Sequence, residues 1–597
     1  MFDRLRREWL ALTGALRALR MTSPVAKNPT RVFPFVFEEL AARSGDAPAL
    51  IGAAESYSYS GLDARANRYA RWAREQGIAK GDTVALLMPN RPEYLAFWLG
   101  VTRAGGAVAL LNTNLAGASL AHCINIVTPR AVVVATDLAP AFASARAMLT
   151  GSPAIWSHGP GAAGDRRLDE AVEALDGAAL APADRPSLTI EDKALYIYTS
   201  GTTGMPKAAN INHYRLMAMS HGFCGVMNLK PDDRMYDCLP MYHSNGGVLA
   251  TCASLVGGGS VVIREKFSAR DFWEDVVRSG ATAVFYIGEL CRYLVNTPES
   301  PAERQHQVRI FCGNGMRPDV WPAFKERFRV PVIMEWYAAT EGNVAVFNWD
   351  GTPGAVGRIP GWLSHRFPVK VVRYDVENEV PVRGADGLCE ECAPGEVGEM
   401  IGKILNDPKA PANRFEGYAD RSATETKILR DAFERGDAWF RTGDLMRRDA
   451  EGYFFFVDRI GDTFRWKGEN VATSEVQETL TAFPGIADAN VYGVAVPGRD
   501  GRAGMAALVV QGDLDLVALQ AHISASLPDY ARPIFLRIQR EIEVTGTFKQ
   551  KKVDLVQEGF DPSVVHDEIW FANPETRRFE RLDPALYRRI VSGDIRL

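Results

Sequence analysis

The stretch that organises the chain is a short apolar run followed by a loop of small and hydroxyl-bearing residues. It runs Tyr196-Ile197-Tyr198-Thr199-Ser200-Gly201-Thr202-Thr203-Gly204-Met205-Pro206-Lys207. The aromatic and β-branched residues at its start predict the end of a strand, and the residues after them predict a flexible polar loop. Gly201 and Gly204 remove the Cβ atoms that would stop backbone amides from converging on an anion. The pattern therefore predicts a strand that leads into a phosphate-binding loop.

The side chains of this loop suit a polyphosphate better than they suit a plain connector. Lys207 supplies a mobile positive charge, and no acidic residue interrupts the run, which favours phosphate binding over a solvated Gly/Ser/Thr connector. A Walker loop has the pattern G-x-x-x-x-G-K-[ST], whereas Ala208 follows the lysine here. We interpret the segment as a nucleotide loop of another kind. The hydroxyl donors are Thr199, Ser200, Thr202 and Thr203.

A second signal follows a strand that we predict at residues 330–334. The chain there runs Glu335-Trp336-Tyr337-Ala338-Ala339-Thr340-Glu341-Gly342. An aromatic ring can stack on a purine, a hydroxyl can contact a phosphate oxygen, and a carboxylate can hold the Mg²⁺ that bridges phosphates. A glutamate at the end of a strand is usually only solvated. The prediction therefore rests on these three side-chain types occurring close together.

Length and composition define the class of protein. A chain of 597 residues exceeds the size of a single core, so we expect more than one domain. With 47% hydrophobic residues, 24% charged residues and a net charge of -5, the composition is that of a globular protein without a global attraction to nucleic acid. Eight irregularly spaced cysteines indicate reduced thiols, and the start of the chain lacks the pattern of a secretory signal. We therefore expect a cytoplasmic protein.

Residues 1–20 predict an amphipathic basic helix. Arginines at positions 4, 6, 7, 17 and 20 lie largely off its apolar face. Two interpretations stay open: the apolar face packs on the body of the protein, or it inserts shallowly into the inner face of a membrane as a weak, reversible anchor. The apolar face consists of Phe2, Leu5, Trp9, Leu12, Leu16 and Leu19.

Strands and helices alternate through the first part of the chain, which predicts a layered α/β domain. The strand at 308–312 ends in Gly313-Asn314-Gly315, and glycine-exposed backbone at the carboxyl end of a strand is where open α/β sheets bind ligands. Residues 353–404 are β-rich, and residues 474–555 predict a compact α+β domain. The other elements expected are strands at 84–87, 108–111, 131–134 and 281–287 and helices at 93–104 and 120–126.

These motifs resemble those of a known superfamily. The 196–209 string resembles the phosphate-binding signature of the adenylate-forming enzymes, which include acyl-CoA synthetases, luciferases and peptide-synthetase adenylation domains. Within it, the string is most similar to the fatty acid transport protein and very-long-chain acyl-CoA synthetase branch. The 335–342 string resembles the family's Y-G-x-T-E motif, with Ala338 in place of the common glycine, and residues 441–444 resemble its R-T-G-D motif. The resemblance covers the chain apart from about its first thirty residues.

The resemblance implies an α/β fold with a large N-terminal domain of layered α/β subdomains and a small β subdomain. A small, mobile α+β domain follows at the C-terminus. We accordingly expect an amphipathic segment at residues 1–30, a large AMP-binding domain at 31–458 and a small domain at 459–597. The hinge between the last two is expected at residues 458–462.

The resemblance also implies roles for single residues. Lys549 is expected to contact the substrate carboxylate and α-phosphate, Glu341 to hold Mg²⁺, and Thr340 to contact the α-phosphate. His243 is expected to line the site where the nucleotide and acyl pockets meet, without acting as an acid or base. Lysine clusters usually coat a surface, so Lys551 and Lys552 are expected there on general grounds. The nucleotide and coenzyme contacts are expected from Tyr198, Thr199, Ser200, Gly201, Thr202, Thr203, Gly204, Lys207, Gly313, Asn314, Gly315, Trp336, Tyr337, Thr340, Asp444, Arg459 and Gly468.

The function that the resemblance implies is activation of a long-chain or very-long-chain fatty acid. ATP and Mg²⁺ would convert the acid to an acyl-AMP, and coenzyme A would then take the acyl group as a thioester. Fatty acid and coenzyme A are the expected partners, and a homodimer is an assembly that the sequence leaves open. Two alternatives stay open as well: a CoA ligase for sterol-derived or aryl carboxylates, and a fatty acid uptake protein coupled to acyl activation.

Overall fold

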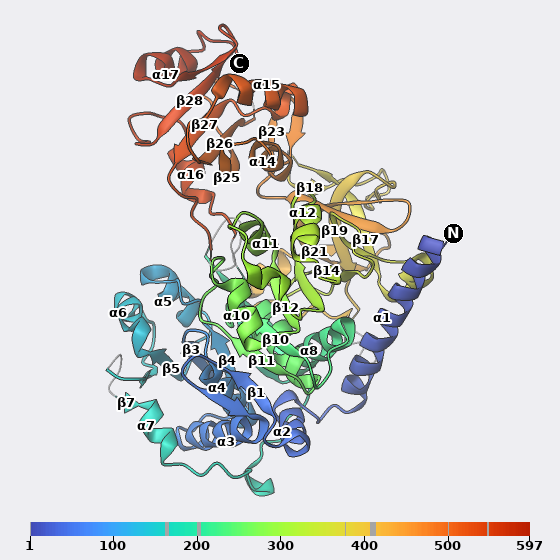
Figure 1. The fold of residues 1–597 in the computed structure, drawn as a ribbon, viewed down its shortest axis with the longest axis vertical. Coiled ribbons are helices and arrows are strands. Elements are labelled where there is room, and N and C mark those ends of the chain that lie inside the picture. Colours follow the sequence, from blue (N-terminus) through green and yellow to red (C-terminus); the bar gives the residue numbers. More distant parts are fainter. Residues whose placement is uncertain are drawn as a thin grey trace. The chain divides into compact units, whose positions relative to one another are not determined.

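The computed structural model describes residues 2–161, 166–199, 205–376, 378–405, 413–499, 501–545 and 549–597. Within those ranges the chain forms two compact units, and both combine helices with strands (Figure 1). The predicted α/β class, with a large N-terminal part and a smaller C-terminal part, is confirmed. The larger unit comprises Met1–Pro368, Gly402–Arg430 and Ala438–Phe440, and the smaller comprises Val369–Ile401, Asp431–Asp437 and Arg441–Leu597.

One sheet of the larger unit has the strand order β7-β6-β5-β3-β4-β8-β9. Its strands are parallel except β9, which forms an antiparallel pair with β8. Strands β3, β4 and β5 are buried apolar runs, as expected for parallel strands covered on both faces. The strands are β3 (Thr83–Leu87), β4 (Ala107–Leu110), β5 (Ala131–Ala135), β6 (Ala154–His158), β7 (Arg166–Arg167), β8 (Lys193–Thr199) and β9 (Lys207–Asn212).

The second sheet of this unit has the order β15-β14-β13-β12-β10-β11-β1-β2. Strands β13 and β14 each continue beyond their predicted ends, so Gly313 and Asn314 and the aromatic part of the 335–342 string lie within strands. The strands are β1 (Pro48–Ile51), β2 (Ser56–Ser58), β10 (Arg234–Asp237), β11 (Ser260–Ile263), β12 (Ala283–Ile287), β13 (Ile310–Asn314), β14 (Val332–Ala338) and β15 (Ala345–Asn348). The carboxyl ends of β10 to β14 therefore meet at one edge.

Helices cover both sheets, and the connections follow the predicted alternation. A π-helical segment, Ser244–Cys252, precedes α9. The helices of the unit are α1 (Phe2–Lys27), α2 (Phe33–Ser44), α3 (Tyr59–Glu75), α4 (Pro92–Arg103), α5 (Gly117–Asn125), α6 (Ala139–Arg146), α7 (Leu168–Glu173), α8 (His213–Met227), α9 (Ala253–Val256), α10 (Phe272–Ser279), α11 (Gly288–Val295), α12 (Val320–Phe328) and α13 (Arg421–Glu425). Short strands β16 (Ala355–Arg358) and β20 (Ile428–Arg430) complete it. Across the described ranges, no helix is both long enough and apolar enough to cross a membrane.

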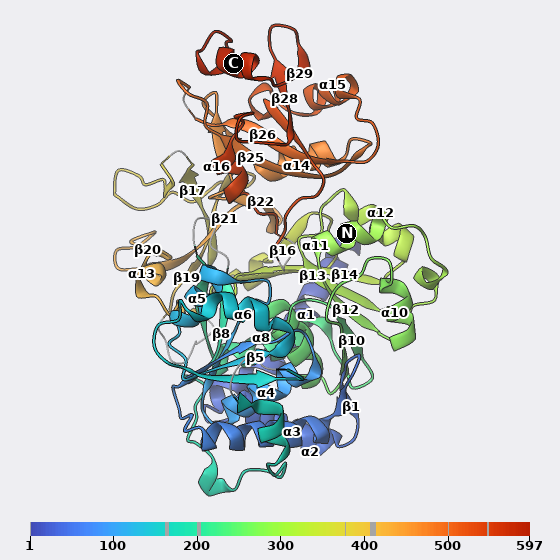
Figure 2. The ribbon, with the colours of Figure 1, turned by 90° about the vertical axis from the view of Figure 1, so that its left-hand side faces the viewer.

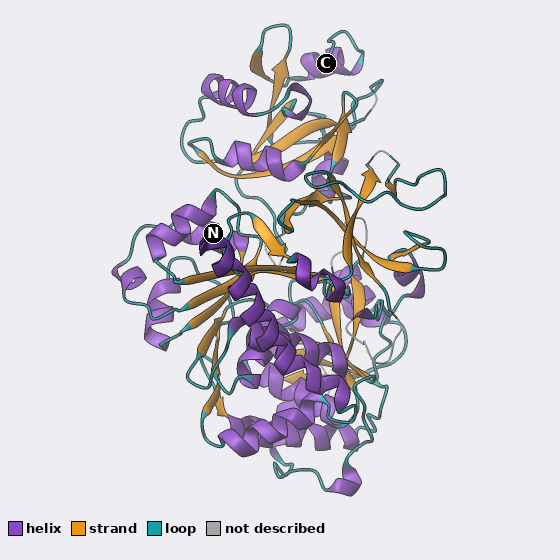
Figure 3. Cartoon of the chain, turned by 90° about the vertical axis from the view of Figure 1, so that its right-hand side faces the viewer, coloured by secondary structure: helices purple, strands orange, loops and turns teal. Residues whose placement is uncertain are grey.

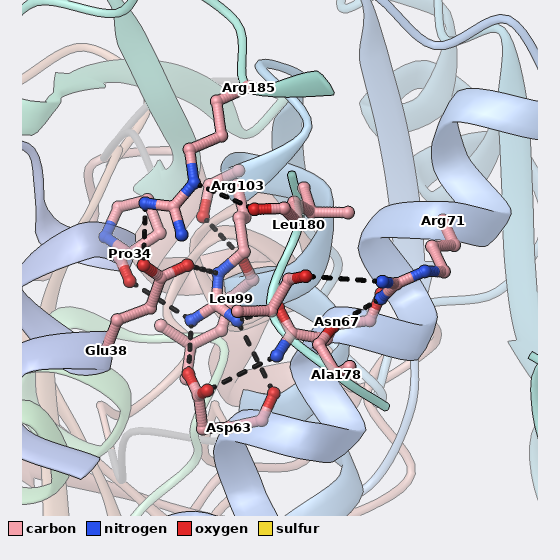
Figure 4. Close-up of polar contacts among 12 residues, drawn as sticks. Pro34, Glu38, Asp63, Asn67, Arg71, Leu99, Arg103, Ala178, Leu180 and Arg185 are labelled. Atoms are coloured by element: carbon pink, nitrogen blue, oxygen red, sulfur yellow. Dashed lines mark hydrogen bonds and ion pairs between the residues drawn. The ribbon is translucent and has the colours of Figure 1, made fainter. Parts of the chain in front are cut away.

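A fully buried arginine joins three helices of the larger unit. Arg103, at the end of α4, is 0% exposed, and Figure 4 shows it pointing toward residues of α2 and α3. Its guanidinium donates to Asp63 Oδ1 at 2.7 Å, to Asn67 Oδ1 at 2.5 Å and to the carbonyl oxygen of Pro34 at 3.1 Å. A buried charge is tolerated when it is paired and its donors are used. Arg103 therefore ties α2, α3 and α4 together.

The smaller unit contains a sheet of order β22-β21-β19-β17-β18 and a second of order β25-β26-β27-β28-β29 (Figure 2). A separate hydrophobic core, which includes Leu508 and Leu536, underlies the second sheet. The strands are β17 (Val369–Asp375), β18 (Val380–Pro381), β19 (Val397–Lys403), β21 (Ala438–Arg448), β22 (Tyr453–Arg459), β23 (Phe464–Trp466), β24 (Glu469–Val471), β25 (Ile486–Val494), β26 (Ala503–Val510), β27 (Phe535–Gln539), β28 (Glu568–Asn573) and β29 (Arg578–Arg581). The helices are α14 (Thr473–Thr481), α15 (Leu516–Ser526), α16 (Val553–Glu558) and α17 (Pro584–Val591).

The predicted domain boundary at residue 458 falls inside the smaller unit. The sequence assigned residues 369–401 and 441–458 to the large domain. In the structure they belong to the same compact unit as the C-terminal part of the chain. They are the β-rich residues whose strands pair with one another in the first sheet of the smaller unit. The hinge expected at residues 458–462 stays a prediction.

Candidate active site

The predicted phosphate loop joins β8 to β9. Thr199 is the last residue of β8, and it stands opposite Lys207, the first residue of β9, in the antiparallel pair. The strand pair therefore closes the base of the loop, and the threonine hydroxyl and the lysine side chain begin from neighbouring positions. The other predicted contacts of the loop, Ser200, Gly201, Thr202, Thr203 and Gly204, lie outside the residues that the structure describes.

A tyrosine that no predicted motif contains links this loop to the acidic string. The Tyr418 hydroxyl donates to Glu341 Oε1 at 2.6 Å, and Lys207 Nζ lies 5.7 Å from the centroid of the Tyr418 ring. Both the tyrosine and the glutamate are buried. Burial, and next the charge of Glu341, raise the pKa of Tyr418 above its ordinary value. The hydroxyl therefore stays protonated and acts as a donor to the carboxylate.

Tyr418 reaches this place because its segment runs along β9. The backbone N–H of Asn210 donates to the carbonyl oxygen of Gly417 at 3.0 Å, and the N–H of Ala419 donates to the carbonyl oxygen of Ala208 at 2.9 Å. Sequence reasoning missed Tyr418 because this pairing joins residues about two hundred positions apart. A lone tyrosine beside a glycine carries no local signal of such a role.

Arg215, in the first turn of α8, holds the backbone of the acidic string. Its Nε donates to the carbonyl oxygen of Thr340 at 2.8 Å, and its Nη2 donates to the carbonyl oxygens of Ala339, at 3.1 Å, and Gly342. A planar guanidinium with several N–H donors suits converging carbonyl oxygens, which an ammonium group could not bind in the same geometry. The string is therefore fixed through its main chain, and Arg215 occupies neither the Thr340 hydroxyl nor the Glu341 carboxylate. Sequence reasoning also missed Arg215.

The π-helical segment begins at the same edge of the sheet. Ser244 Oγ lies 3.0 Å from Thr340 Oγ1, and the Asn245 amide donates to Asn314 Oδ1 at 3.0 Å. A Cβ atom on Gly247 would lie 2.2 Å from the carbonyl oxygen of Met241, so glycine is needed for the chain to fold back on itself here. π-helical turns occur frequently at functional sites.

His243, the residue before this segment, is partly buried. Its ring centroid lies 5.0 Å from that of Tyr242. Its neighbour Ser244 bonds Thr340, and Asn245 bonds Asn314. The structure therefore brings His243 to the edge where the ends of β13 and β14 meet. Its lining role stays a prediction.

A buried carboxyl group orders the turn after β13. Glu335 accepts hydrogen bonds from the Tyr286 hydroxyl at 2.5 Å and from the backbone N–H groups of Gly315 at 2.8 Å and Met316 at 3.0 Å. Burial raises the pKa of Glu335 to about 8, and these donors oppose the shift. Gly315 adopts a φ of +82°, a conformation that favours glycine. The Gly313-Asn314-Gly315 turn is thus held in place from β14.

The two aromatic residues of the acidic string point to opposite faces of β14 because side chains alternate along a strand. Tyr337 is partly exposed. Trp336 is 4% exposed, and its ring packs edge to face on Phe223 of α8, with centroids 4.9 Å apart. The indole thus belongs to the core and offers no open face to a nucleotide, so we drop Trp336 from the predicted contacts.

Tyr198 is also enclosed by protein. It is 5% exposed, and its hydroxyl donates to the carbonyl oxygen of Cys123 on α5 at 2.6 Å. Its phenol anchors β8 to that helix. The predicted contact of the Tyr198 side chain with nucleotide is therefore replaced by a role in holding the start of the loop.

The smaller unit carries the residues predicted for ribose and coenzyme A. Asp444 and Arg459 stand opposite each other on β21 and β22, with the arginine Nε 3.9 Å from Asp444 Oδ1. Lys467 and Gly468 form the two-residue turn between β23 and β24, with φ values of +53° and +82°. Left-handed conformations at both positions are typical of a type I′ hairpin.

Lys549 is exposed and is hydrogen-bonded to Thr545 of the smaller unit. Its backbone N–H donates to Thr545 Oγ1 at 3.1 Å, and its carbonyl oxygen accepts from the Thr545 N–H at 2.7 Å. The expectation that Lys552 coats the surface is wrong. Its ammonium lies 2.9 Å from Thr473 Oγ1 and 3.3 Å from Asp462, because α14 and the 458–462 segment pack beside it.

The carboxylate of Glu341 fits a magnesium ion that is bound mainly through substrate phosphates. Mg²⁺ usually keeps several waters and takes one or two protein carboxylates together with phosphate oxygens. In the ranges that the structure describes, no group of three or more His, Cys, Asp or Glu side chains could form a metal cage. The single buried carboxylate of Glu341, beside the predicted phosphate loop, therefore agrees with a magnesium ion that is held mainly by substrate phosphates.

Comparison with known proteins agrees with this geometry. Residues 37–403 match the family model described as AMP-binding enzyme, and residues 475–549 match the AMP-binding enzyme C-terminal domain. The chain is 39% identical over 603 residues to long-chain fatty acid transport protein 1 of Mus musculus, a match that covers 99% of this chain and 92% of the relative. It is 43% identical over 538 residues to long-chain fatty acid transport protein 3 of the same species, covering 88% and 79%.

Two solved structures show the same fold. ATP-bound MatB from Rhodopseudomonas palustris aligns with a TM-score of 0.72 and 25% identity, covering 87% of this chain and 98% of that one. The anthranilate CoA ligase AuaEII in complex with anthranoyl-AMP aligns with a TM-score of 0.75 and 18% identity, covering 89% and 98%. The second likeness shows the fold alone.

Proposed function

Because the chain belongs to the AMP-binding enzyme family, we propose that it is an ATP-dependent, AMP-forming acyl-CoA synthetase for long-chain or very-long-chain fatty acids. The acid class follows from its relatives, which are long-chain fatty acid transport proteins. It uses ATP and coenzyme A as co-substrates and Mg²⁺ as its metal. The activity proceeds through an acyl-AMP intermediate.

The observation that carries this proposal is the bonded cluster around Glu341. Tyr418 joins its carboxylate to the lysine at the base of the phosphate loop, and Arg215 fixes the backbone on both sides of it. A hydroxyl, a carboxylate and an ammonium are thereby held together where β9 of one sheet approaches the end of β14 of the other. Magnesium bound at Glu341 would neutralise charge on the phosphates. These groups together match the needs of a bound nucleoside triphosphate.

The first step overcomes the weakness of a carboxylate as an electrophile, because its leaving group would be oxide. A carboxylate oxygen of the fatty acid forms a bond to the α-phosphorus of ATP, and the bond from that phosphorus to the bridging oxygen breaks. Pyrophosphate leaves, and Lys207 and the amides of the 199–207 loop hold its charge. Thr340 donates to the α-phosphate. Lys549 balances the negative charge that develops between the carboxylate and the α-phosphate.

In the second step the coenzyme A thiolate forms a bond to the carbonyl carbon of acyl-AMP. The bond from that carbon to the phosphate oxygen breaks, and AMP leaves. Asp444 holds the ribose hydroxyls through both steps, since a carboxylate accepts hydrogen bonds from a diol, and Arg459 contacts the ribose or a phosphate. Tyr337 stacks on the adenine, and Gly468 borders the path of the pantetheine arm.

Lys549→Ala tests the division of labour between the two steps. We expect pyrophosphate release with palmitate to fall by about 100-fold or more, because the charge between the carboxylate and α-phosphate is no longer balanced. Thioester formation from supplied palmitoyl-AMP should stay close to that of the unaltered protein. Lys551→Ala is the matched control, since Lys551 is exposed and ion-paired with Glu543. Equal loss of both steps in Lys549→Ala would contradict the assignment.

A set of acids tests the substrate class. We expect AMP formation to be fastest with long-chain and very-long-chain acids and slower with medium-chain acids. Preference for benzoate-like or sterol-derived acids would favour the ligase alternative. Absence of ATP-to-AMP conversion with every acid would refute the proposed function.

A second function, fatty acid uptake coupled to acyl activation, is favoured by the names of the relatives, which are transport proteins. Coupling predicts that uptake by cells expressing the protein is lost in Glu341→Ala, because activation traps the acid inside. Uptake that persists in this variant would separate transport from the ligase site.

A further inference from the structure

Helix α1 carries its large apolar side chains on the side that faces away from the protein. This arrangement reverses the usual one, in which the apolar face of a surface helix packs on the core. Of the two interpretations that the sequence left open, packing of this face on the body is therefore wrong. We call the six residues the outer stripe: Phe2, Leu5, Trp9, Leu12, Leu16 and Leu19, which are 90%, 58%, 64%, 36%, 55% and 45% exposed.

The opposite face of α1 holds the helix on the protein through small residues. A Cβ atom on Gly14 would lie 2.1 Å from the ring of Trp349, and one on Gly225 of α8 would lie 2.7 Å from the carbonyl oxygen of Arg17. Arg17 Nε also donates to the carbonyl oxygen of Gly225 at 3.1 Å. Because these close contacts fix the rotation of the helix, the outer stripe is directed away from α8. Figure 3 shows α1 lying across the outside of the larger unit.

The charges of α1 complement an anionic surface. Residues 2–27 include six basic and two acidic side chains, although the whole chain has a net charge of -5. Arg4, Arg6 and Arg20 are exposed near the outer stripe. One of the two acids, Glu8, is already used, because it pairs with Arg358 and accepts a hydrogen bond from Trp362 Nε1 at 2.8 Å.

A cavity of about 300 Å³ lies on the basic flank of the helix. Arg6 and Arg17 line it from α1, and Arg309 and Lys325 line it from the body, with one acid, Asp350. Arg309 is already ion-paired with Asp233, but the other three cations still outnumber Asp350, so the cavity suits an anionic group such as the phosphate of a lipid headgroup. It borders the same helix that bears the outer stripe.

We propose that the outer stripe of α1 docks the protein on the surface of an anionic lipid bilayer. The six apolar side chains insert shallowly among the acyl chains, and the flanking arginines contact the headgroup phosphates. The helix lies in the plane of the membrane, which agrees with the finding that no described helix could span it. This inference goes beyond the proposed function, because vesicle binding requires no catalytic step.

Cosedimentation of the full chain with vesicles tests the proposal. We expect binding to mixed phosphatidylcholine and phosphatidylglycerol vesicles, with weaker binding to phosphatidylcholine alone. The triple variant Leu5→Ser, Trp9→Ser, Leu16→Ser should lower the partition coefficient by about 100-fold or more, since it removes apolar surface from the contact. The matched control changes exposed apolar residues elsewhere: Met148→Ser, Val517→Ser and Val564→Ser, which are 51%, 70% and 54% exposed in the parent.

A charge variant separates headgroup attraction from apolar insertion. Arg6→Gln with Arg20→Gln should weaken binding to the mixed vesicles by about tenfold, and much less to phosphatidylcholine alone. Native protein that fails to bind mixed vesicles overturns the proposal, as does an unchanged partition coefficient in the stripe variant. A dimer that the stripe variant abolishes, without vesicle binding, also overturns it and identifies the stripe as an interface between copies. Thermal melting of the variants confirms that each is folded.

Discussion

At the residue scale, the geometry of the acidic string depends on a side chain that lies outside it. Arg215 binds the carbonyl oxygens on both sides of Glu341, so the carboxylate is positioned through the main chain. Its neighbour Asn212 caps α8 by accepting a hydrogen bond from the Arg215 N–H. The start of a helix, an arginine and a loop are thereby tied together. Arg215 is a positioning residue and does not itself need to contact the substrate.

Arg215→Lys should therefore impair adenylation selectively. An ammonium cannot reproduce the guanidinium hydrogen bonds, so we expect acyl-AMP formation to fall by about tenfold to 100-fold. The Mg²⁺ concentration that gives half the maximal rate should rise several-fold, because Glu341 is less well placed. Pyrophosphate release against Mg²⁺ measures both effects. The control is Arg414→Lys, since that arginine makes an ion pair with Glu191 on the surface. An unchanged Mg²⁺ dependence would show that Arg215 only stabilises the fold.

A second residue makes stability depend on pH. Asp237, the last residue of β10, is 0% exposed and accepts hydrogen bonds from the Leu239 N–H at 3.0 Å and the Thr251 hydroxyl at 3.1 Å. Burial raises its pKa to about 8, while in the unfolded chain its pKa is about 3.9. Between these values the folded protein binds a proton that the unfolded chain does not. The contribution of Asp237 to the free energy of unfolding is therefore fully present at low pH. It falls as the pH rises toward 8, by up to about 1.4 kcal/mol per pH unit.

Asp237→Asn should remove this contribution. The amide stays neutral, its oxygen can accept from Leu239, and its N–H can donate to a reoriented Thr251 hydroxyl. Relative to the parent, the variant should gain stability steadily between about pH 5 and pH 8. Melting temperatures by fluorimetry across that range provide the measurement. Parallel pH profiles for the two proteins would mean that Asp237 is ionised in the fold.

At the element scale, the sequence predicted the parallel strands well, because strands buried on both faces are plain apolar runs. Strand β5 differs from its prediction by one residue, and the helix predicted at 93–104 is α4 (Pro92–Arg103). Strand β13 lies two residues further along the chain than predicted, and β14 was predicted too short, because the motif residues at both ends were interpreted as loop. Because β14 extends through Trp336, the alternation of side chains along the strand turns the indole ring toward the core.

The sequence predicted those parts of the site whose functional residues follow one another in the chain. The phosphate loop and the acidic string are recognisable because hydroxyl, aromatic and acidic residues follow one another in the chain. Tyr418 and Arg215 were missed because their partners lie at Glu341 and around it, far away in sequence. The sequence likewise identified the apolar stripe of α1 but not the direction it faces, which depends on glycine contacts with other elements.

The contact between α1 and α8 gives an element-scale prediction. Gly225→Ala should loosen α1, because its Cβ would lie 2.7 Å from a backbone oxygen of α1, whereas Gly222→Ala should not, because its nearest neighbour is a methyl group at 3.5 Å. Overpacking of this kind costs about 1–3 kcal/mol. We expect trypsin to cleave within residues 2–27 about tenfold faster in Gly225→Ala. Equal cleavage rates in the two variants would contradict the close contact.

At the scale of the whole molecule, the two units have separate hydrophobic cores. Leu290 is fully buried in the main core of the larger unit, and Leu536 is fully buried in the core of the smaller one. A core that is complete within one unit can melt without the other, so calorimetry should resolve two transitions. A substitution at either buried leucine should then shift only the melting transition of its own unit.

Leu290→Ala and Leu536→Ala test this independence. Each substitution should cost about 2–5 kcal/mol, since it removes buried methyl groups and leaves a cavity. We expect each variant to lower one transition by on the order of 5 °C or more and to leave the other in place. The pair is matched, because both leucines are 0% exposed and the chemical change is the same. A single transition, or two that move together in either variant, would mean that the units unfold cooperatively, and the smaller unit could not then act as a separately folded body in the second step.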